Sequence, residues 1–271
     1  MSLRINLNVA ALNAHRQLQG TDNALASSIE KLSSGFRINR GADDPAGLAI
    51  SENLRAQIGG LGQAIANSND AINMIRTAEG SLAEVHSLLR AMRNLAVHAA
   101  NTGAVDATAI AADQTQLDQA VAALDRIANN TQFGTTKLLD GTATGLVFQI
   151  GAFESQTVSV DIASVLAADI TVDAINLSTG AAAAITTVTT AISTVSTMRA
   201  ELGAIQKALE SNIASVGVAK ENIAASESSI RDTDMAAEMV SFTRSQILLQ
   251  TGIAMLVQAN TAPQALLALL R

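Results

Sequence analysis

The last forty residues of the chain carry large apolar side chains with the period of an α-helix. Met235, Phe242, Leu249 and Leu256 recur every seven positions. Met239 and Ile253 each follow one of these residues by four positions. On a helix these six positions lie on one stripe, which is the pattern of a seam against a partner helix. The other faces are also rich in apolar residues. Such a helix must be covered by another part of the chain, by another copy of it or by a membrane.

The first segment of the chain has a matching period. From Leu3 to about Ser33, an apolar residue recurs every seven positions, at Ala11, Leu18, Leu25 and Leu32. The two terminal seams agree in length and period, so we expect the termini to pair as a coiled coil. The alternative is a single helical bundle in which the termini are helices but not each other's partners.

Two long helical patterns lie between the terminal segments. One runs from Leu48 to Ala99 and follows an Asp44–Pro45 pair, which is typical of an N-cap with proline at the first helical position. At 1.5 Å per residue this helix would be a rod of roughly 75–80 Å. A shorter helix follows with Asp106 as its predicted cap, and a second long helix is predicted from Ala184 to Ile230.

The period changes in residues 131–183, where alternation over 146–150 and 157–162 predicts a β-hairpin and the remainder is irregular. The predicted fold is therefore mainly α: a long antiparallel helical bundle or coiled coil with paired terminal helices and a small β-hairpin region. We expect residues 1–42 and 231–271 to form the terminal pair, 43–130 and 184–230 the long-helix bundle, and 131–183 the hairpin and an irregular surface segment, with a hinge near 230–236.

The amino-acid composition and the distribution of charge limit the classes of partner that the chain could bind. Hydrophobic residues make up 48% of the chain and aromatic residues 2%, which suits close helix packing. Residues 104–183 contain nine acidic residues and only two basic ones, Arg126 and Lys137, so this segment alone carries the whole net charge of −7. An acidic middle with almost no aromatic residues argues against a nucleic-acid partner. We also expect no membrane-spanning segment and no cleaved secretory signal peptide, because no long enough apolar run is present.

Candidate chemistry is sparse, and the chain is predicted not to be an enzyme and to hold no metal or cofactor. There is no cysteine, and His86 and His98 lie twelve apart, about 120° around one helix, so they do not converge on a metal ion. Gly59, Gly60 and Gly62 fit no phosphate-binding motif and are interpreted as packing or bending positions. Adjacent carboxylates before a proline, and those at 232 and 234, are interpreted as helix caps.

Long stretches at both ends resemble bacterial flagellin. In the N-terminal part these are INLNVAALNAHRQL, EKLSSGFRINRGADDPAGLAISENLRAQIGGL and TAEGSL, and at the other end IRDTDMAAEMVSFTRSQILLQTGIAMLVQANTAPQALLALLR. The resemblance implies a structural subunit that self-assembles into the extracellular flagellar filament for motility. It implies export through the flagellum's own apparatus with an export chaperone, and contact with hook-junction and cap proteins. The terminal pair would form the inner core of the filament and the long helices its outer core layer.

Some positions depart from the family pattern. Phe133-Gly134-Thr135 stands where the family usually has Phe-Asn-Gly. The family's surface for an innate immune receptor would fall on Arg90, Arg93, Leu95 and Gln116 of this chain. Because Gln116 stands where the family usually has glutamate and Ala91 where it has arginine, the resemblance predicts weak recognition at most.

Three other functions remain as alternatives. A hook–filament junction protein shares related ends, but the SSGFRIN and LLALLR segments favour the filament itself. An amphipathic, membrane-active protein would need a basic face, and Arg244 is the sole cation between Asp232 and Leu270. An enzyme would need a catalytic set that the sequence does not offer.

Overall fold

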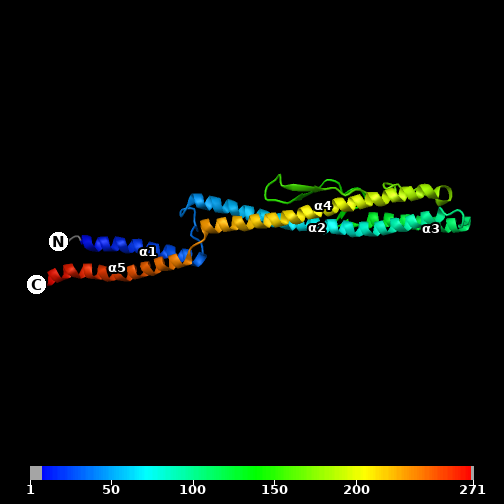
Figure 1. Cartoon of the computed structure of the whole chain (residues 1–271). Coiled ribbons are helices and arrows are strands. Elements are labelled where there is room, and N and C mark those ends of the chain that lie inside the picture. Colours follow the sequence, from blue (N-terminus) through cyan, green and yellow to red (C-terminus); the bar gives the residue numbers. More distant parts are fainter. Residues whose placement is uncertain (1–7, 270–271) are drawn as a thin grey trace. The chain divides into compact units, whose positions relative to one another are not determined.

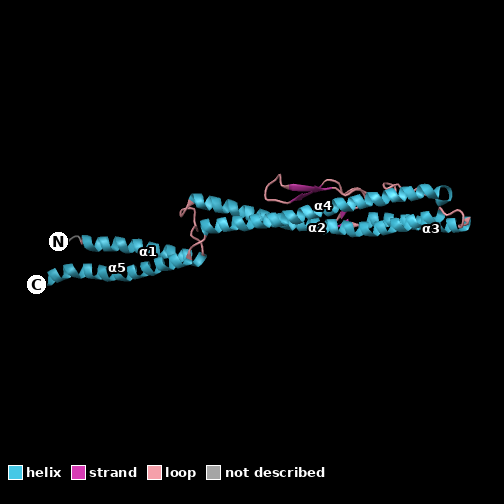
Figure 2. Ribbon diagram, viewed as in Figure 1, coloured by secondary structure: helices cyan, strands magenta, loops and turns pink. Residues whose placement is uncertain are grey.

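The structure is a computed structural model that describes residues 8–269, with the side chains of the last helix described as far as residue 261. Its elements are α1 (Val9–Ser34), α2 (Pro45–Ala99), α3 (Ala107–Asn130), β1 (Gln132–Phe133), β2 (Thr136–Lys137), β3 (Leu146–Gln149), β4 (Thr157–Val160), α4 (Leu177–Arg231) and α5 (Met235–Leu269). Figures 1 and 2 show how strongly helices dominate. The predicted mainly α class is confirmed. The chain divides into unit 1, residues 1–56 and 222–271, and unit 2, residues 57–221.

Local capping chemistry sets where the first helices of the long-helix region begin. The Asp44 carboxylate accepts the backbone N–H of Gly47 at 2.9 Å, and α2 begins at Pro45, as predicted. At α3 the Asp106 carboxylate accepts the N–H of Ala109 at 2.8 Å. These side chains satisfy N–H groups that have no partner inside the helix, which fixes each start.

The core of unit 2 is built from one stripe of each of three helices, which run side by side in Figure 1. The segment between α3 and α4 also supplies buried side chains, so it is more than a surface region. The fully buried large residues include Leu82, Leu89 and Met92 of α2, Leu117 and Leu124 of α3, Leu138 and Leu139 of the intervening segment, and Val188, Val195 and Leu209 of α4. Burial of these aliphatic side chains is the main stabilising contribution to unit 2.

The predicted β-hairpin is confirmed and is held on the helices of unit 2 by two amides. Strands β3 and β4 are antiparallel, with Leu146 opposite Val160. The Asn67 side chain donates to the carbonyl of Gln149 at 3.0 Å, and the Asn212 side chain donates to the carbonyl of Ile150 at 3.0 Å. Each amide satisfies a hairpin carbonyl that has no strand partner.

A second antiparallel pair, β1 and β2, was not predicted. It is a two-residue ladder that turns at Gly134, whose φ of +60° lies in the left-handed region. Glycine adopts that conformation without the steric cost that a Cβ would bring. The turn therefore accounts for a glycine at this position, where the sequence departs from the pattern of the family that it resembles.

The predicted start of α4 at Ala184 is wrong, because the helix begins at Leu177. The Asn176 side chain accepts the N–H groups of Ser178 and Thr179, which caps a first turn, and Leu177 is buried in the core. Gly180 then has non-helical angles, φ −155° and ψ 43°, so α4 has a kink near its start. The cap at Asn176 and the kink at Gly180 lie only four residues apart, and a stretch this short shows no helical period, which explains the error.

Helix α4 is the one helix among the described residues that is long and apolar enough to cross a membrane by length and composition. Its most apolar stripe, which includes Val188 and Val195, is buried in the core of unit 2. Several outer positions carry threonines whose hydroxyls donate to the carbonyl four residues earlier, as Thr190 does to Thr186 at 3.0 Å. The hydropathy of α4 therefore reflects core residues together with uncharged hydroxyl side chains.

Gly60 lies against the hairpin, and its neighbour Gly59 provides a control for testing that contact. A Cβ on Gly60 would lie 3.1 Å from the Cβ of Ala152, whereas a Cβ on Gly59 would meet nothing within 4 Å. We expect Gly60→Val to lower the free energy of unfolding by about 1–3 kcal/mol, because the hairpin must move to make room. Gly59→Val should change it by less than about 0.5 kcal/mol. Chemical denaturation checks both variants, and equal effects would contradict the packing role.

Candidate functional site

The terminal helices α1 and α5 pair side by side in unit 1 (Figure 1). Three contacts along their length fix an antiparallel register. The Asn8 side chain donates to the carbonyl of Ala259 at 2.8 Å, and a Cβ on Gly252 would lie 2.7 Å from the Leu18 Cδ1 atom. Farther along, the Ser28 hydroxyl donates to the Glu238 carboxylate. The predicted pairing of the termini is confirmed.

The covered side of each helix alternates large and small residues. The less exposed positions follow 3-4 spacing and are Ala11, Ala14, Leu18, Thr21, Leu25, Ser28 and Leu32 on α1, and Glu238, Phe242, Ser245, Leu249, Gly252, Leu256 and Ala259 on α5. The large residues lie seven apart on both helices, and small or polar residues lie between them. We call these two rows the seam. Small residues let the two backbones approach closely, as at Gly252, where the Leu18 side chain fills the space of a missing Cβ.

Of the predicted stripe on α5, Phe242, Leu249 and Leu256 lie on the seam with α1 and three other residues do not. The assignment of all six to a self-assembly interface stays a prediction. Met235, Met239 and Ile253 are each between 47 and 49% exposed and lie outside the seam. A repeat of seven can be completed by steps of three then four or of four then three. In the structure the spacing is three then four. Ser245 follows Phe242 by three residues and Gly252 follows Leu249 by three, so both small residues lie against α1. The sequence period alone does not distinguish the two.

Beyond the seam, α5 has a wide exposed apolar surface. We call this surface the outer face of α5, and its large residues are Met235, Met239, Val240, Ile247, Leu248, Ile253, Met255 and Val257. Glu238 and Arg244 are the only charged residues in the helix. Part of the face is hollowed into an open groove of about 410 Å³ that is lined by Met239, Val240, Thr243, Arg244 and Ile247. A soluble monomer rarely exposes so many large apolar side chains on one helix, so the outer face of α5 is a candidate interface.

The predicted hinge between α4 and α5 is a structured junction. A short antiparallel bridge joins Phe36 to Asp232, and the N–H of Arg37 donates to the carbonyl of Arg231 at 2.7 Å. The Arg231 side chain is only 11% exposed, bonds to the Glu52 carboxylate and lies 4.8 Å above the Phe36 ring. A guanidinium over an aromatic face and against a carboxylate combines two favourable interactions. The break after α1 is therefore attached to the break before α5.

The carboxylates beside these breaks have structural roles, but Asp234 is a helix cap as predicted whereas Asp232 and Asp43 are not. Asp234 caps α5 by accepting the N–H groups of Ala236 and Ala237 at 2.9 and 3.1 Å. Asp232 instead accepts the Ser228 hydroxyl at 2.6 Å, so it lies at the end of α4 and is no N-cap. Asp43 accepts the N–H groups of Asn39 and Arg40 and closes the loop before α2.

The predicted receptor surface lies in unit 2. Arg90 and Gln116 are exposed, and Arg93 is exposed with its Nε donating to the Thr189 hydroxyl at 3.3 Å. Leu95 is half-buried and packs against the core of unit 2. The four residues come from α2 and α3, and recognition by an immune receptor at this surface stays a prediction.

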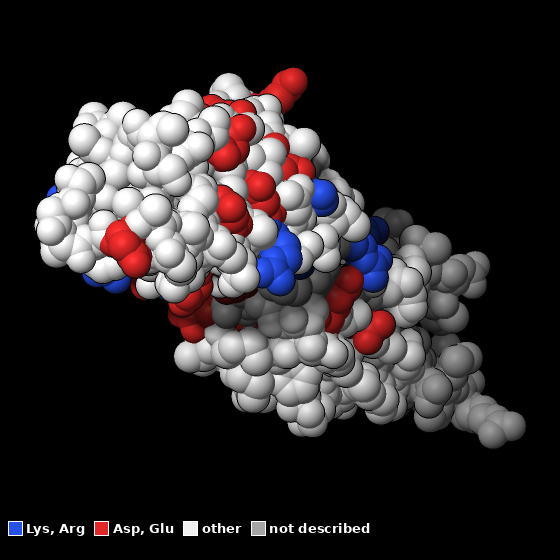
Figure 3. Space-filling model, turned by 90° about the vertical axis from the view of Figure 1, so that its right-hand side faces the viewer, with Lys and Arg blue, Asp and Glu red and all other residues white. Residues whose placement is uncertain are grey.

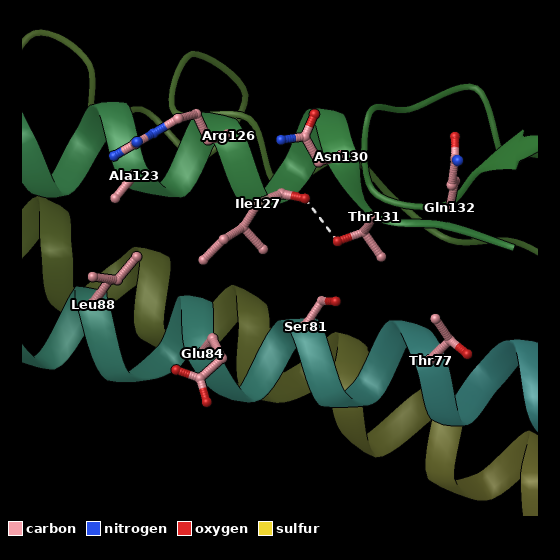
Figure 4. A pocket seen from close by; sticks show the side chains of 10 residues that line it. All are labelled: Thr77, Ser81, Glu84, Leu88, Ala123, Arg126, Ile127, Asn130, Thr131 and Gln132. Atoms are coloured by element: carbon pink, nitrogen blue, oxygen red, sulfur yellow. Dashed lines mark hydrogen bonds between the residues drawn. The ribbon is translucent and has the colours of Figure 1, made fainter.

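Groups that could carry catalysis do not converge in the part of the chain that the structure describes. The groove between α2 and α3 has a volume of about 720 Å³ and holds Glu84 and Arg126 on opposite walls (Figure 4). It contains hydroxyls but no histidine. The His98 Nδ1 atom lies 2.6 Å from the Asp113 Oδ2 atom, and this pair links the end of α2 to α3. No three His, Cys, Asp or Glu residues within the described range lie together as metal ligands would.

Acidic side chains predominate over basic ones on one face of the described residues, the face turned toward the viewer in Figure 3. Asp106, Asp118, Asp161, Asp169 and Asp173 are all exposed. A nucleic acid would be repelled by such a surface.

Two family models match the regions that contain these helices. Residues 5–144 match the bacterial flagellin N-terminal helical region, and residues 185–270 match the bacterial flagellin C-terminal helical region. The chain belongs to the bacterial flagellin family. Flagellin is a structural protein, and the chain is a structural subunit of the flagellar filament, which lies outside the cell. The resemblance seen in the sequence is therefore confirmed.

Relatives of similar length support this assignment along the whole chain. The chain is 46% identical to a flagellin of Halalkalibacterium halodurans, a match that covers 98% of this chain and 99% of the relative. It is 44% identical to a flagellin of Bacillus subtilis, with 99% of this chain and 100% of the relative covered. It is also similar to the crystal structure of Bacillus cereus flagellin, at 27% identity and a TM-score of 0.51, over 56% of this chain and 88% of that one.

Adjacent leucines on α5 test the division between seam and outer face in the unassembled chain. Leu249 lies on the seam, whereas Leu248 is 51% exposed. We expect Leu249→Ala to cost about 1–3 kcal/mol, because it leaves a gap against α1. Amide exchange in α1 and α5 should then accelerate about tenfold for each 1.4 kcal/mol lost, while Leu248→Ala leaves it within a factor of two or three. Acceleration of the same size in both variants would contradict the assignment.

The loop before α2 gives a prediction in acid. The N–H groups of Arg40 and Asn39 donate to the Asp43 carboxylate and hold its pKa below the ordinary value of 3.8. Because the folded pKa is lowered, the ionised carboxylate stabilises the loop fully above pH 3.8 and ceases to do so as the pH falls through the lowered pKa. Amide chemical shifts of residues 39 and 40, followed by NMR against pH, should titrate below 3.8. A midpoint at or above that value would contradict the assigned hydrogen bonds.

Proposed function

We propose that this flagellin polymerises through the outer face of α5, and that the α1–α5 pair, weakly stable in the single chain, becomes fixed as neighbouring copies cover it. One observation carries the proposal: α5 exposes its large apolar residues on the side that α1 leaves free. Burying apolar side chains of this size contributes about 1.5–3 kcal/mol each. Assembly can thereby offset the conformational entropy that is lost when the terminal helices become fixed.

The geometry of the pair supports this mechanism over simple pairing of two helices. A two-helix pair needs only the seam, and the seam is already filled by residues such as Phe242 and Leu249. Val240, Met255 and Val257 are 58–65% exposed and lie outside it. In a polymer each copy of α5 would meet other copies on these sides. The terminal pair would then be the inner core of the filament, with the long helices of 43–130 and 184–230 as its outer core layer.

The same surface suggests how the subunit is handled before assembly. An exposed apolar helix would aggregate in the cell, so we propose that an export chaperone covers it and that the chain leaves through the flagellar export apparatus without a cleaved signal peptide. Hook-junction and cap proteins would meet the same terminal helices at the two ends of the filament. Binding of each partner should compete with polymerisation.

Valine substitutions with equal starting exposure test the proposal. Val240 on α5 and Val147 on β3 are both 65% exposed. We expect Val240→Asp to raise the critical concentration for polymerisation about thirtyfold or more, because an unpaired charge buried in the interface costs at least about 2 kcal/mol. Val147→Asp should change it less than threefold. Pelleting of seeded filaments measures both, and equal inhibition by both substitutions would contradict the assignment of the interface to α5.

Deletion of residues 235–271 separates assembly from folding. We expect the shortened chain not to polymerise while the helices of 48–130 and 184–230 stay folded, because unit 2 has its own core. Electron microscopy of the seeded protein and circular dichroism check the two halves of this statement. Filaments formed by the shortened chain would refute the proposal.

A membrane-active role is the second candidate, since an exposed apolar helix could also enter lipid. The outer face of α5 contains Arg244 as its one cation, whereas helices that bind anionic membranes have a basic face. Flotation with anionic liposomes distinguishes the two candidates. Flotation of a chain that does not polymerise would favour the membrane.

A further inference from the structure

The methionines that the structure describes fall into two groups by exposure. Met235, Met239 and Met255 are 47, 49 and 65% exposed, and all three lie on α5. The methionines of unit 2 are protected: Met74 and Met92 are 3 and 0% exposed, and Met198 is half-buried against the core. Every well-exposed thioether among the described residues therefore lies on the outer face of α5.

None of the three exposed methionines belongs to the seam with α1. The seam residues of α5 nearest to them are Glu238, Phe242 and Leu256, while Met239 lines the open groove beside Val240. Changing the polarity of these thioethers would leave the α1–α5 contacts unchanged. It would also leave the core of unit 2 unchanged, since no exposed methionine lies there.

We propose that Met235, Met239 and Met255 are sites of reversible oxidation that prevents polymerisation of the unassembled subunit. This inference rests on the proposed function of the outer face of α5. The oxidant class is a peroxide, with hydrogen peroxide as the simplest member. The thioether sulfur attacks one peroxide oxygen, a sulfur–oxygen bond forms, the oxygen–oxygen bond breaks, and after proton transfer water leaves. The sulfur loses two electrons and the peroxide gains them.

The product is a poor fit to an apolar interface. A sulfoxide is polar and accepts hydrogen bonds, so burying it without a donor is unfavourable. Two hydroxyls of this helix are already engaged, since Thr243 donates to the Met239 carbonyl at 2.8 Å and Thr251 to the Ile247 carbonyl at 3.0 Å, while the exposed amides of Gln246, Gln250 and Gln258 stay as donors between the apolar side chains. Arg244 is the one charged donor of the helix. Oxidation therefore weakens assembly while the subunit stays folded.

The change is reversible by known chemistry. Methionine sulfoxide reductases return the thioether, with one enzyme class for each sulfoxide epimer. A subunit oxidised before assembly is then withheld rather than lost. Once copies cover the outer face, the same thioethers become protected, so oxidation acts on the subunit and not on the finished polymer.

The experiment treats the full-length monomer with hydrogen peroxide and maps sulfoxides by peptide mass spectrometry. We expect Met235, Met239 and Met255 to oxidise at least about tenfold faster than Met74 and Met92. The critical concentration for polymerisation should rise at least about tenfold, with an unchanged circular dichroism spectrum. Treatment with both classes of reductase should restore the original value.

A resistant variant makes the assignment specific. In the variant with Met235→Leu, Met239→Leu and Met255→Leu, leucine keeps the volume and apolar character of methionine. The variant should polymerise equally well before and after peroxide. If leucine itself impairs assembly, restoration of the oxidised natural chain by the reductases remains the decisive readout.

The outcomes separate this inference from the proposed function. If untreated protein polymerises and fully oxidised protein does so equally well, the inference is wrong and the proposed function stands. Loss of polymerisation in the peroxide-treated leucine variant would also overturn it, because other residues would then be responsible. If the untreated protein with intact methionines does not polymerise through α5, the proposed function fails and this inference fails with it.

Discussion

The apolar surface of α5 is wider than one partner helix can cover. Its seam with α1 takes up one side of the helix, through residues such as Phe242 and Leu249, and leaves large aliphatic side chains exposed on the remaining sides. Exposure of such an apolar surface to water is unfavourable in free energy, whatever the structure of the rest of the chain. The arrangement of small and large residues in the seam, the near absence of charge on α5 and the membership in the flagellin family all agree with a subunit that is completed by its own copies.

The junction beside α1 and α5 explains how a local pair becomes part of a larger subunit. Backbone bonds join the segment after α1 to the segment between α4 and α5, and the Arg231 side chain contacts both Phe36, which follows α1, and Glu52 of α2. The first residues of α2 and the last of α4 thus belong to the same unit as the terminal pair. Long helices that cross from one unit into the other carry the chain into a separately packed core.

Helix caps could be predicted from the sequence, because they form between neighbouring residues. The individual contacts between two helices could not be predicted. Asp106 caps its helix through bonds to the next residues, so its role is visible in a short stretch. The residues of α5 that contact α1 were predicted only in part. Whether Ser245 and Gly252 or the methionines lie on the seam depends on how closely α1 approaches. The His98–Asp113 pair joins two helices across a turn, and neither helix alone indicates it. Gly180 follows a cap so closely that the first turn of α4 had no period to read.

The absence of cysteine from the chain makes the central claim directly measurable. A single cysteine can be placed at the exposed position Ile247 on α5, or at Val218 of α4 as a reference of similar exposure. The rate of maleimide labelling is then compared between monomer and filament. We expect rapid labelling of both sites in the monomer and at least a hundredfold slower labelling (about the ratio expected for a site closed from solvent by a few kcal/mol) of Ile247→Cys alone in the filament. Equal labelling of Ile247→Cys in monomer and filament would contradict the claim that copies of the chain cover α5.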